Sequence, residues 1–498
     1  MNKNNLIKRL CHIGIEISAE KNIDTLLEMI LKESMQIANC DAGSIYFIEG
    51  EQEQCLTFKY TQNLSIEFPF KSFRMAIDKN SIAGACAVTG ELYNFTSMDE
   101  TVDKIGIRHN PTFDDSVGYR TRNMLVVPLK NYDEEVIGVM QLINKKKGNE
   151  RLVDDLAYET ILPFTEFDEE VIESLASQVA ILIERTRLYE SIQDLLESMT
   201  QSLAKAVDQR DPVTGGHSER VANYTLDLAK HISEAEDKSL ASFDFTTDKK
   251  RELYYASMLH DVGKIGVPEY LLTKESKLPE EHMYAIEARY KYLMLLLKIR
   301  QEKMLDTADP NSQRIQDMLL DGAKILSRVN KAGFLREEDE RFIEELKTYK
   351  IEDEDGSVID LLTPYEYDQL SIKRGNITSE ERSKINSHAQ KTFEILDEIN
   401  WTKSLSKVPV IASQHHEKLN GKGYPYGITS DTLSYEAKIM AIADIFDALT
   451  AKDRPYKPAL SVEKSLSILK EEVANGNLDR VLVDHFENMI LERGYPHD

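Results

Sequence analysis

The sequence predicts a multidomain protein in which an α+β domain, a long connecting helix and an all-α helical bundle follow one another. Three observations support this fold class. Residues 1–167 alternate between helical and strand-like spacing of apolar residues. Residues 168–209 read as one helix without glycine or proline, and residues 210–498 are helical in pattern, with a helical insertion at about residues 280–372. A chain of 498 residues is long enough for two or three domains.

The composition excludes several classes of partner. The chain has 61 Lys and Arg against 86 Asp and Glu, a net charge of −25, so we expect neither nucleic acid nor an anionic membrane as a partner. The four cysteines, at positions 11, 40, 55 and 86, have no paired spacing, which is typical of a reducing cytosol. The N-terminus is polar, and no apolar run reaches the roughly 20 residues that span a bilayer. We therefore expect a cytoplasmic protein without a signal peptide.

The first domain begins with a helical pattern and continues with strands. Residues 6–38 carry apolar side chains at helical spacing, and Asp24 and Thr25 supply a start signal. The period then changes to short β-rich runs separated by turn residues. These expected strands are residues 42–48, 55–60, 123–129 and 136–144. The order indicates one sheet flanked by helices.

Three stretches of this domain, "SIYFIE", "MLVVPLKNYDEEVIGVMQLINKK" and "FTEFDEEVIESLASQVAILIERTRLYE", resemble a GAF domain in their order. The resemblance implies a sensor with a pocket for a small ligand. Asn144-Lys145, Phe164 and Asp168-Glu169 are also similar to the motif of the cyclic-nucleotide-binding GAF class, with a longer gap before Phe164. The alternative, which we favour, is that Lys145 and Asp168 form a structural ion pair between the last strand and the closing helix. A small molecule or a cyclic nucleotide stays open as the ligand.

The connecting helix carries a heptad pattern of apolar residues with a few polar positions. Such a stripe favours a parallel partner helix, hence a homodimer, and packing onto the chain's own domains is the alternative. The polar positions would let two registers lie close in energy. The expected seam consists of Ile172, Leu175, Val179, Leu182, Thr186, Tyr189, Gln193, Leu196, Thr200, Leu203 and Val207.

The bundle contains side chains that can bind metal. His260 and Asp261 are adjacent after an apolar helical run, and an imidazole with a carboxylate can share a pair of divalent ions. Alone, such a pair would read as a core histidine beside an acid. Further candidates follow on separate helices, which is how helical bundles build dinuclear sites. With them the candidate ligands are His217, His260, Asp261, His388, His415, His416 and Asp444.

The motifs around these residues, "TGGHSERV", "LHDVGKIGVP", "ITSEERSKINSHAQ", "HHEKLNGKGYP" and "IADIFDALTAKDRPYKPA", resemble the HD-GYP branch of the HD phosphohydrolases. The resemblance implies hydrolysis of cyclic di-GMP with two metal ions, Fe or Mn rather than Zn. It makes the seven residues above metal ligands, with Asp261 as the bridging, catalytic carboxylate. Lys264 would act on the phosphate, in catalysis and in binding, together with Arg454 and Lys457. Gly423 and Tyr424 would shape the substrate loop.

Three departures from the family pattern matter. Val213 occupies the position where some relatives have an acidic ligand for a third metal, so we expect two metals. Asn420 replaces the usual Asp before Gly421, and we expect it to form a turn. The insertion separates the His260 motif from His388, and Arg289 occupies the position where a histidine would be expected. We interpret the insertion as a stabilising outrigger or dimer contact, with a lid over the site as the alternative.

Together these features predict a metal-dependent phosphodiesterase that cleaves cyclic di-GMP to linear pGpG or to GMP, under control of a ligand at the GAF domain. Two alternatives stay open. The bundle could bind a cyclic dinucleotide and signal with little turnover, although the full ligand set argues against this. It could also cleave a different cyclic dinucleotide, such as cyclic GMP–AMP, because the motifs recognise metal and phosphate rather than bases.

Overall fold

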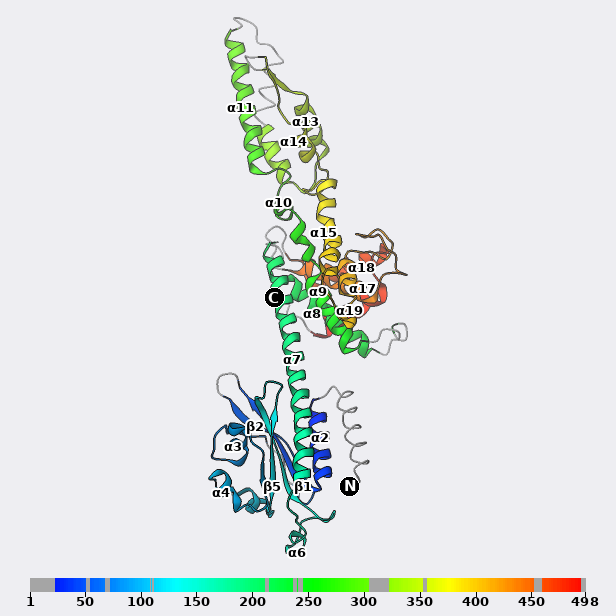
Figure 1. Cartoon of the computed structure of the whole chain (residues 1–498). Helices are drawn as coiled ribbons and strands as arrows, with labels where there is room; N and C mark the ends of the chain where they lie inside the picture. Colours follow the sequence, from blue (N-terminus) through cyan, green and yellow to red (C-terminus); the bar gives the residue numbers. More distant parts are fainter. Residues whose placement is uncertain are drawn as a thin grey trace. The chain divides into compact units, whose positions relative to one another are not determined.

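The computed structural model describes residues 23–50, 54–67, 72–107, 109, 112–210, 215–235, 240, 245–303, 322–352, 356–451 and 459–493. The chain forms two compact units, Met1–Leu195 and Leu196–Asp498 (Figure 1). No helix within the described ranges combines the length and the apolar character that crossing a bilayer requires. The expected helix over residues 6–38 is described from Ile23 to Ala38, and its first part lies outside the described residues.

The first unit is built on one antiparallel sheet of six strands in the order β3-β2-β1-β6-β5-β4. All four predicted strands are present and extend by a few residues. The two short strands β3 and β4 were not predicted, because three residues give too short a pattern to recognise. The strands are β1 (Cys40–Glu49), β2 (Cys55–Asn63), β3 (Arg74–Ala76), β4 (Tyr93–Phe95), β5 (Met124–Lys130) and β6 (Val136–Lys145).

Helices cover both faces of this sheet, so the predicted α+β fold is confirmed. On one face, α2 (Ile23–Ala38) and the first part of α7 (Glu166–Arg210) pack on Ile45 and Leu125 (Figure 1). On the other face, α3 (Ile82–Thr89) packs on the alternate residues Tyr46 and Val126, as the two-residue period of a strand requires. Three short helices complete the unit: α4 (Glu100–Ile105), α5 (Thr112–Val117) and α6 (Asp155–Tyr158).

The Lys145–Asp168 pair takes the structural role that we favoured. The Lys145 ammonium at the end of β6 contacts the Asp168 carboxylate at the start of α7. The same Asp168 oxygen accepts hydrogen bonds from the N–H and the hydroxyl of Thr165, at 2.6 and 2.7 Å. The carboxylate therefore anchors the first turn of α7 to the sheet.

Helix α7 runs from Glu166 to Arg210 and corrects part of the predicted seam. Ile172, Leu175, Val179 and Leu182 are buried in the core of the first unit, and Val207 is buried in the core of the second. The ends of that stripe are therefore covered by the chain's own domains, which was the alternative to a partner helix. Sequence spacing could not separate the two, because a helix on a sheet and a helix in a coiled coil need almost the same apolar period.

The second unit is an all-α bundle around one large core that includes Val221, Leu253, Phe446 and Phe486. Its helices come from distant parts of the chain, as predicted for a dinuclear site. They are α8 (His217–Glu234), α9 (Thr247–Leu259), α10 (Glu269–Leu272), α15 (Ser379–Asp397), α16 (Val408–Ser413), α17 (Tyr435–Thr450), α18 (Val462–Ala474) and α19 (Arg480–Arg493).

The insertion folds around a core of its own, which contains Tyr290, Leu326, Ile343 and Leu361 among others. We expected a helical insertion, but residues 350–352 and 358–360 pair as a small antiparallel sheet. Its elements are α11 (Glu280–Lys303), helical residues 322–331, α13 (Glu337–Thr348), β7 (Lys350–Glu352), β8 (Val358–Asp360) and α14 (Pro364–Leu370). Arg289 forms a contact within the insertion, because its Nη2 donates to both oxygens of Glu366 at 2.7 Å.

The two ends of the insertion are fastened to each other by buried lysines. Lys277, which is fully buried, donates to the carbonyl oxygens of Leu370 and Ile372 at 3.1 and 2.6 Å. Lys274 donates to both oxygens of Glu381 at 2.8 Å. Glu381 belongs to the capping box with which Thr378 starts α15. The insertion therefore leaves and rejoins the bundle at one place.

Asn330 supplies a testable contact inside this junction. Its side chain accepts from the N–H of Leu278 at 2.6 Å and donates to the Leu278 carbonyl at 3.0 Å. Asn330→Ala leaves the buried N–H of Leu278 unpaired, at a cost of about 1–3 kcal/mol, whereas the Leu278 carbonyl keeps its hydrogen bond from the Ser276 hydroxyl at 2.7 Å. We expect hydrogen exchange in peptides covering Leu278 to accelerate by about tenfold or more, measured by mass spectrometry. The exposed neighbour Lys331 gives the control Lys331→Ala, and equal protection in both variants would contradict this role.

Candidate metal centre

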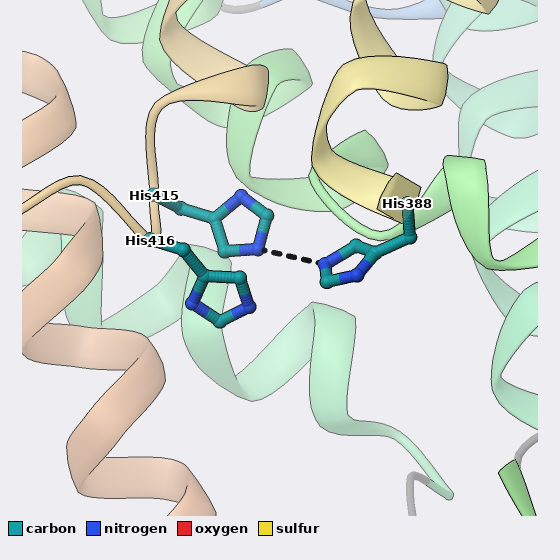
Figure 2. A group of neighbouring side chains, drawn as sticks. All are labelled: His388, His415 and His416. Carbon is teal, nitrogen blue, oxygen red and sulfur yellow. Dashed lines mark hydrogen bonds between the residues drawn. The ribbon is translucent and has the colours of Figure 1, made fainter. Parts of the chain in front are cut away.

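All seven candidate ligands meet inside the second unit. They come from helix ends and from two helix interiors. His217 is the first residue of α8, His260 follows the last residue of α9, and Asp261 precedes a 3-10 turn. His388 and Asp444 lie within α15 and α17, and His415 and His416 follow α16. Every one of them except His416 is buried, and Figure 2 shows three of the imidazoles turned toward one another.

The Asp261 carboxylate lies at the centre of the site. Its Oδ2 is 3.8 Å from His217 Nε2 and 3.5 Å from His260 Nε2. Its Oδ1 is 3.4 Å from His388 Nε2 and 3.9 Å from His415 Nε2. Each oxygen thus faces its own pair of imidazoles, which is the arrangement that a carboxylate bridging two metal ions needs.

Asp444 connects the same two groups from the opposite side. Its Oδ1 is 3.3 Å from His217 Nε2 and 3.9 Å from His260 Nε2. Its Oδ2 is 3.8 Å from His416 Nδ1. Within the described residues, two sets of possible ligands have their donor atoms within 4.8 Å of one another: His217, His260 and Asp261, and His388, His415 and His416.

Backbone carbonyls fix the orientation of three imidazoles. The Nδ1 atoms of His260, His388 and His415 each lie 2.7 Å from the carbonyl oxygen three residues earlier. Nδ1 therefore carries the proton, and Nε2 of each neutral ring presents a lone pair to the centre. His260 Nε2 is buried and has no hydrogen-bond partner among the described residues. Such an orphaned acceptor is what a metal ligand looks like without its metal.

Two of these lone pairs face each other directly. His388 Nε2 and His415 Nε2 are 3.4 Å apart (Figure 2). A hydrogen bond between them would require one ring to carry a second proton, but burial lowers the pKa of both imidazoles. A cation bound by both Nε2 atoms would remove the repulsion between these two acceptors. The residues present therefore fit a centre of divalent ions with nitrogen and carboxylate ligands.

Charge in the site is distributed unevenly. Burial lowers the pKa of His416 to about 4, so this ring is neutral at pH 7. Burial acts in the same direction on His217, but hydrogen bonds to Asp444 and Asp447 outweigh it and raise its pKa to about 10. Burial also opposes ionisation of Asp261, yet the neighbouring Lys264 ammonium holds the pKa of this carboxyl well below its usual range. Asp261 is therefore a carboxylate at neutral pH.

Asp447 is a functional residue that the sequence reasoning missed. His217 Nδ1 donates to Asp447 Oδ2 at 2.7 Å, and Arg220 Nε donates to Asp447 Oδ1 at 2.7 Å. This chain of contacts holds the ring so that its Nε2 faces Asp261 and Asp444. Its position three residues after Asp444 on an apolar helix was the available signal, since ligating histidines commonly donate their other nitrogen to a carboxylate.

A close approach between chain segments brings His260 and His388 together. Thr392 Oγ1 donates to the His260 carbonyl at 2.8 Å and accepts from the Gly263 N–H at 3.0 Å. A Cβ on Gly263 would lie 1.9 Å from the carbonyl oxygen of His388, so only glycine fits. Helix α9 ends at Leu259, and a 3-10 turn places the Lys264 ammonium 2.8 Å from Asp261 Oδ2.

The loop of Gly423 and Tyr424 closes one side of the site. The Tyr424 ring lies 4.7 Å from the His416 ring, and a Cβ on Gly423 would meet the Lys418 nitrogen at 2.4 Å. Glu417 shapes this loop, because its carboxylate accepts hydrogen bonds from three successive backbone N–H groups, of residues 426–428. Asn420 forms the expected turn by accepting from the Lys422 N–H at 3.0 Å. Arg454, Lys457 and Val213 lie outside the described residues.

The first unit holds a separate cavity of about 660 Å³. Its walls combine aromatic rings with polar groups, among them the side chains of Gln141, His109 and Asp114. Tyr46 and Phe58 lie 5.0 Å apart by ring centroids, Phe58 and Phe73 lie 4.8 Å apart, and the Tyr46 hydroxyl donates to Gln141 at 3.1 Å. Lys145 and Asp168, which bind each other, are not among the lining residues.

Both units match the models of described families. The GAF domain family matches residues 22–183, and two HD domain families match residues 214–354 and 360–482. The 3′3′-cGAMP-specific phosphodiesterase 3 of Vibrio cholerae is 25% identical over 278 residues, which cover 56% of this chain and 36% of that protein. The cyclic di-GMP phosphodiesterase response regulator RpfG of Xanthomonas campestris is 34% identical over 102 residues, which cover 20% and 26%.

The first unit also has counterparts among solved structures. The GAF domain of an Acinetobacter phosphoenolpyruvate-protein phosphotransferase is 16% identical, and the match covers 38% of this chain and 97% of that domain with a TM-score of 0.29. The match to the Vibrio cholerae phosphodiesterase covers 36% of that protein, and the match to RpfG covers 26%, so this chain spans only part of the length of both relatives.

Asp447→Ala tests the positioning role of this carboxylate. Without it His217 Nδ1 loses its acceptor and its ring can turn, so we expect metal affinity to fall by about 10–100-fold while the fold is retained. Titration with Mn²⁺, followed by calorimetry, measures the change. The exposed Glu219 on the same helix provides the control Glu219→Ala, which should bind metal like the parent protein. Equal affinity in both variants would show that His217 needs no such support.

Proposed function

Since the chain carries a GAF domain followed by an HD-domain region, we propose that it is a metal-dependent phosphodiesterase of the HD-GYP type that hydrolyses a cyclic dinucleotide. Cyclic di-GMP is the proposed substrate, with linear pGpG or GMP as product. The 3′3′-linked cyclic GMP–AMP is the second candidate, because relatives named for each of the two dinucleotides match this chain.

One observation carries this proposal. The two oxygens of Asp261 face two different pairs of imidazoles, so a single carboxylate can serve two metal sites at once. Purely structural histidine clusters do not need such a bridge, whereas two-metal phosphodiester hydrolysis does. The resemblance to HD-GYP proteins favours Fe or Mn over Zn, and the mixed nitrogen and oxygen ligand set is compatible with all three.

The proposed mechanism divides the work between metal and protein. Two divalent ions would neutralise the phosphodiester, activate water as nucleophile and stabilise the departing oxygen. The side chains of the protein would hold the metal ions and orient the phosphodiester. Asp261 and Asp444 tie the two ligand groups together, and Lys264 is placed to bind a phosphate oxygen and stabilise the charge that develops on it. Tyr424, next to His416, limits the space above the site.

The first unit is the proposed regulatory part. A cavity of about 660 Å³ with aromatic walls has the size and the character of a small-molecule site. We propose that a small ligand binds there and changes the activity of the second unit through α7. A cyclic nucleotide is one candidate, but the Lys145–Asp168 pair gives it no direct support because these two groups bind each other.

A signalling module without turnover is the main rival of this proposal. Such a protein would bind the dinucleotide and metal but hydrolyse nothing. The complete set of five imidazoles and two carboxylates favours catalysis, since binding alone would place little demand on a second metal site.

A cytoplasmic location, where cyclic dinucleotides act as messengers, belongs to the same proposal.

Replacing the central ligands tests the activity. His260→Ala or Asp261→Ala should abolish hydrolysis of both cyclic di-GMP and 3′3′-cGAMP, by about 10³-fold or more, while circular dichroism stays unchanged. Product formation by the Mn²⁺- or Fe²⁺-loaded protein, followed by chromatography, is the measurement. Asp397 is exposed at the end of α15, and Asp397→Ala is the matched control. Full activity in either site variant would reject this centre.

Removal of metal should also destabilise the second unit, independently of activity. Without a cation, the lone pairs of His388 and His415 face each other at 3.4 Å in a buried site. A bound ligand at 1,000 times its dissociation constant stabilises the folded state by about 4 kcal/mol. We therefore expect the melting temperature of the second unit to fall by several degrees after dialysis against EDTA and to recover with Mn²⁺. A melting curve insensitive to both treatments would argue against a metal centre.

A further inference from the structure

The cavity of the first unit contains a carboxylate without a counter-ion. Asp114, in the first turn of α5, lines this cavity of about 660 Å³ and is only 8% exposed. Its two oxygens accept hydrogen bonds from the N–H and the hydroxyl of Thr121, at 2.7 and 3.2 Å. No lysine, arginine or histidine within the described ranges forms an ion pair with Asp114. Because a buried carboxylate is unfavourable without positive charge beside it, this group would attract a cation that enters the cavity.

Three aromatic side chains line another part of the same cavity. The ring centroids of Tyr46 and Phe58 are 5.0 Å apart, and those of Phe58 and Phe73 are 4.8 Å apart. The Tyr46 hydroxyl donates to Gln141 at 3.1 Å, so the polar end of this ring already has a partner. Aromatic faces of this kind favour a flat ring, packed offset or edge-to-face. The aromatic wall therefore suits the apolar part of a ligand.

The register of the sheet separates the carboxylate from the aromatic wall. Tyr119 donates its N–H to the Asp114 carbonyl at 2.9 Å and packs in one cluster with Ala42. Phe58 instead pairs with Tyr46, which lies four residues further along β1 than Ala42. Four residues of strand span about 13 Å at 3.3 Å per residue. The acidic end and the aromatic end thus lie at opposite ends of one sheet face.

We propose that this cavity binds a small organic cation in which a flat aromatic group is joined by a short chain to a protonated amine. The ammonium lies beside Asp114, and the ring packs against Phe58 and Phe73. The inference rests on the proposed role of the cavity as a ligand site and names the chemical class of that ligand. Arylalkylamines have these two parts at a separation that the cavity can span.

A cyclic nucleotide fits the same surroundings less well. Its phosphate would bring a second negative charge into a buried site that already contains Asp114, and like charges repel strongly in the protein interior. The described lining residues include no lysine or arginine that could neutralise it. The first turn of α3 also lines the cavity, but its Gly84 N–H donates to the Ser81 hydroxyl at 3.0 Å. The cavity therefore disfavours anions.

Calorimetric titration of the full chain with matched pairs of compounds tests the charge of the ligand. Tryptamine and 2-phenylethylamine are the cations, and indole-3-propionate and 3-phenylpropionate carry the same rings on a carboxylate. Cyclic AMP and cyclic GMP form the third group. We expect at least one amine to bind with a dissociation constant below about 1 mM, and every anion to bind at least about tenfold more weakly.

Two variants test the position of the ammonium. Asp114→Asn removes the charge but keeps the shape of the side chain and an acceptor for the Thr121 N–H. Affinity for the amine should fall by about tenfold or more, because a charge-assisted hydrogen bond is lost. Asp115→Asn is the matched control, since Asp115 is adjacent in sequence and exposed, and it should bind the amine like the parent protein. Thermal unfolding verifies that both variants are folded.

The proposal is overturned if no amine of the series binds, if amines and carboxylates bind equally well, or if Asp114→Asn and Asp115→Asn have the same affinity. A cyclic nucleotide that binds where the amines do not would keep the cavity as a ligand site and reject only its cationic ligand. None of these titrations involves hydrolysis, so each outcome is independent of the proposed phosphodiesterase activity.

Discussion

The second unit is organised by the convergence of imidazole nitrogens on one carboxylate. Nε2 atoms of four histidines lie within 3.9 Å of an oxygen of Asp261, and those of His388 and His415 face each other at 3.4 Å. The Asp261 carboxylate and the nitrogens of His388 and His415 are all acceptors, and such a group is unfavourable in a buried site unless positive charge lies among them. The demand for that charge explains why residues from five separate segments are brought to one point.

Hydrogen bonds to the helical backbone provide the precision that this convergence needs. Three rings are aimed by hydrogen bonds from Nδ1 to the carbonyl three residues earlier, so a local turn sets the direction of each lone pair. His217 is aimed differently, through Asp447 and Arg220. Gly263 lets the turn after His260 touch the backbone of α15, and Thr392 locks this contact. The positions of these candidate ligands are thus set by hydrogen bonds and close contacts with groups that are not themselves candidate ligands.

The convergence of the seven candidate ligands was predictable from the sequence because each of them lies in a motif with its own local pattern. Asp447 was missed because its role depends on a ring that is 230 residues away in the chain. Whether the predicted seam of α7 packs on the chain's own domains or on a partner helix could not be decided from spacing. Both arrangements need a helical apolar period, and only the packing of Val179 and Leu182 on the sheet shows that this part of the seam is covered by the chain itself.

The fastening at the base of the insertion has a consequence for how this protein can change over evolutionary time. Lys277 ties the outgoing chain to the returning chain, and Lys274 ties it to the first turn of α15. The geometry around His388 is therefore insulated from whatever lies between these two points. The insertion is therefore a module whose length or surface can change without moving the candidate metal ligands of the bundle.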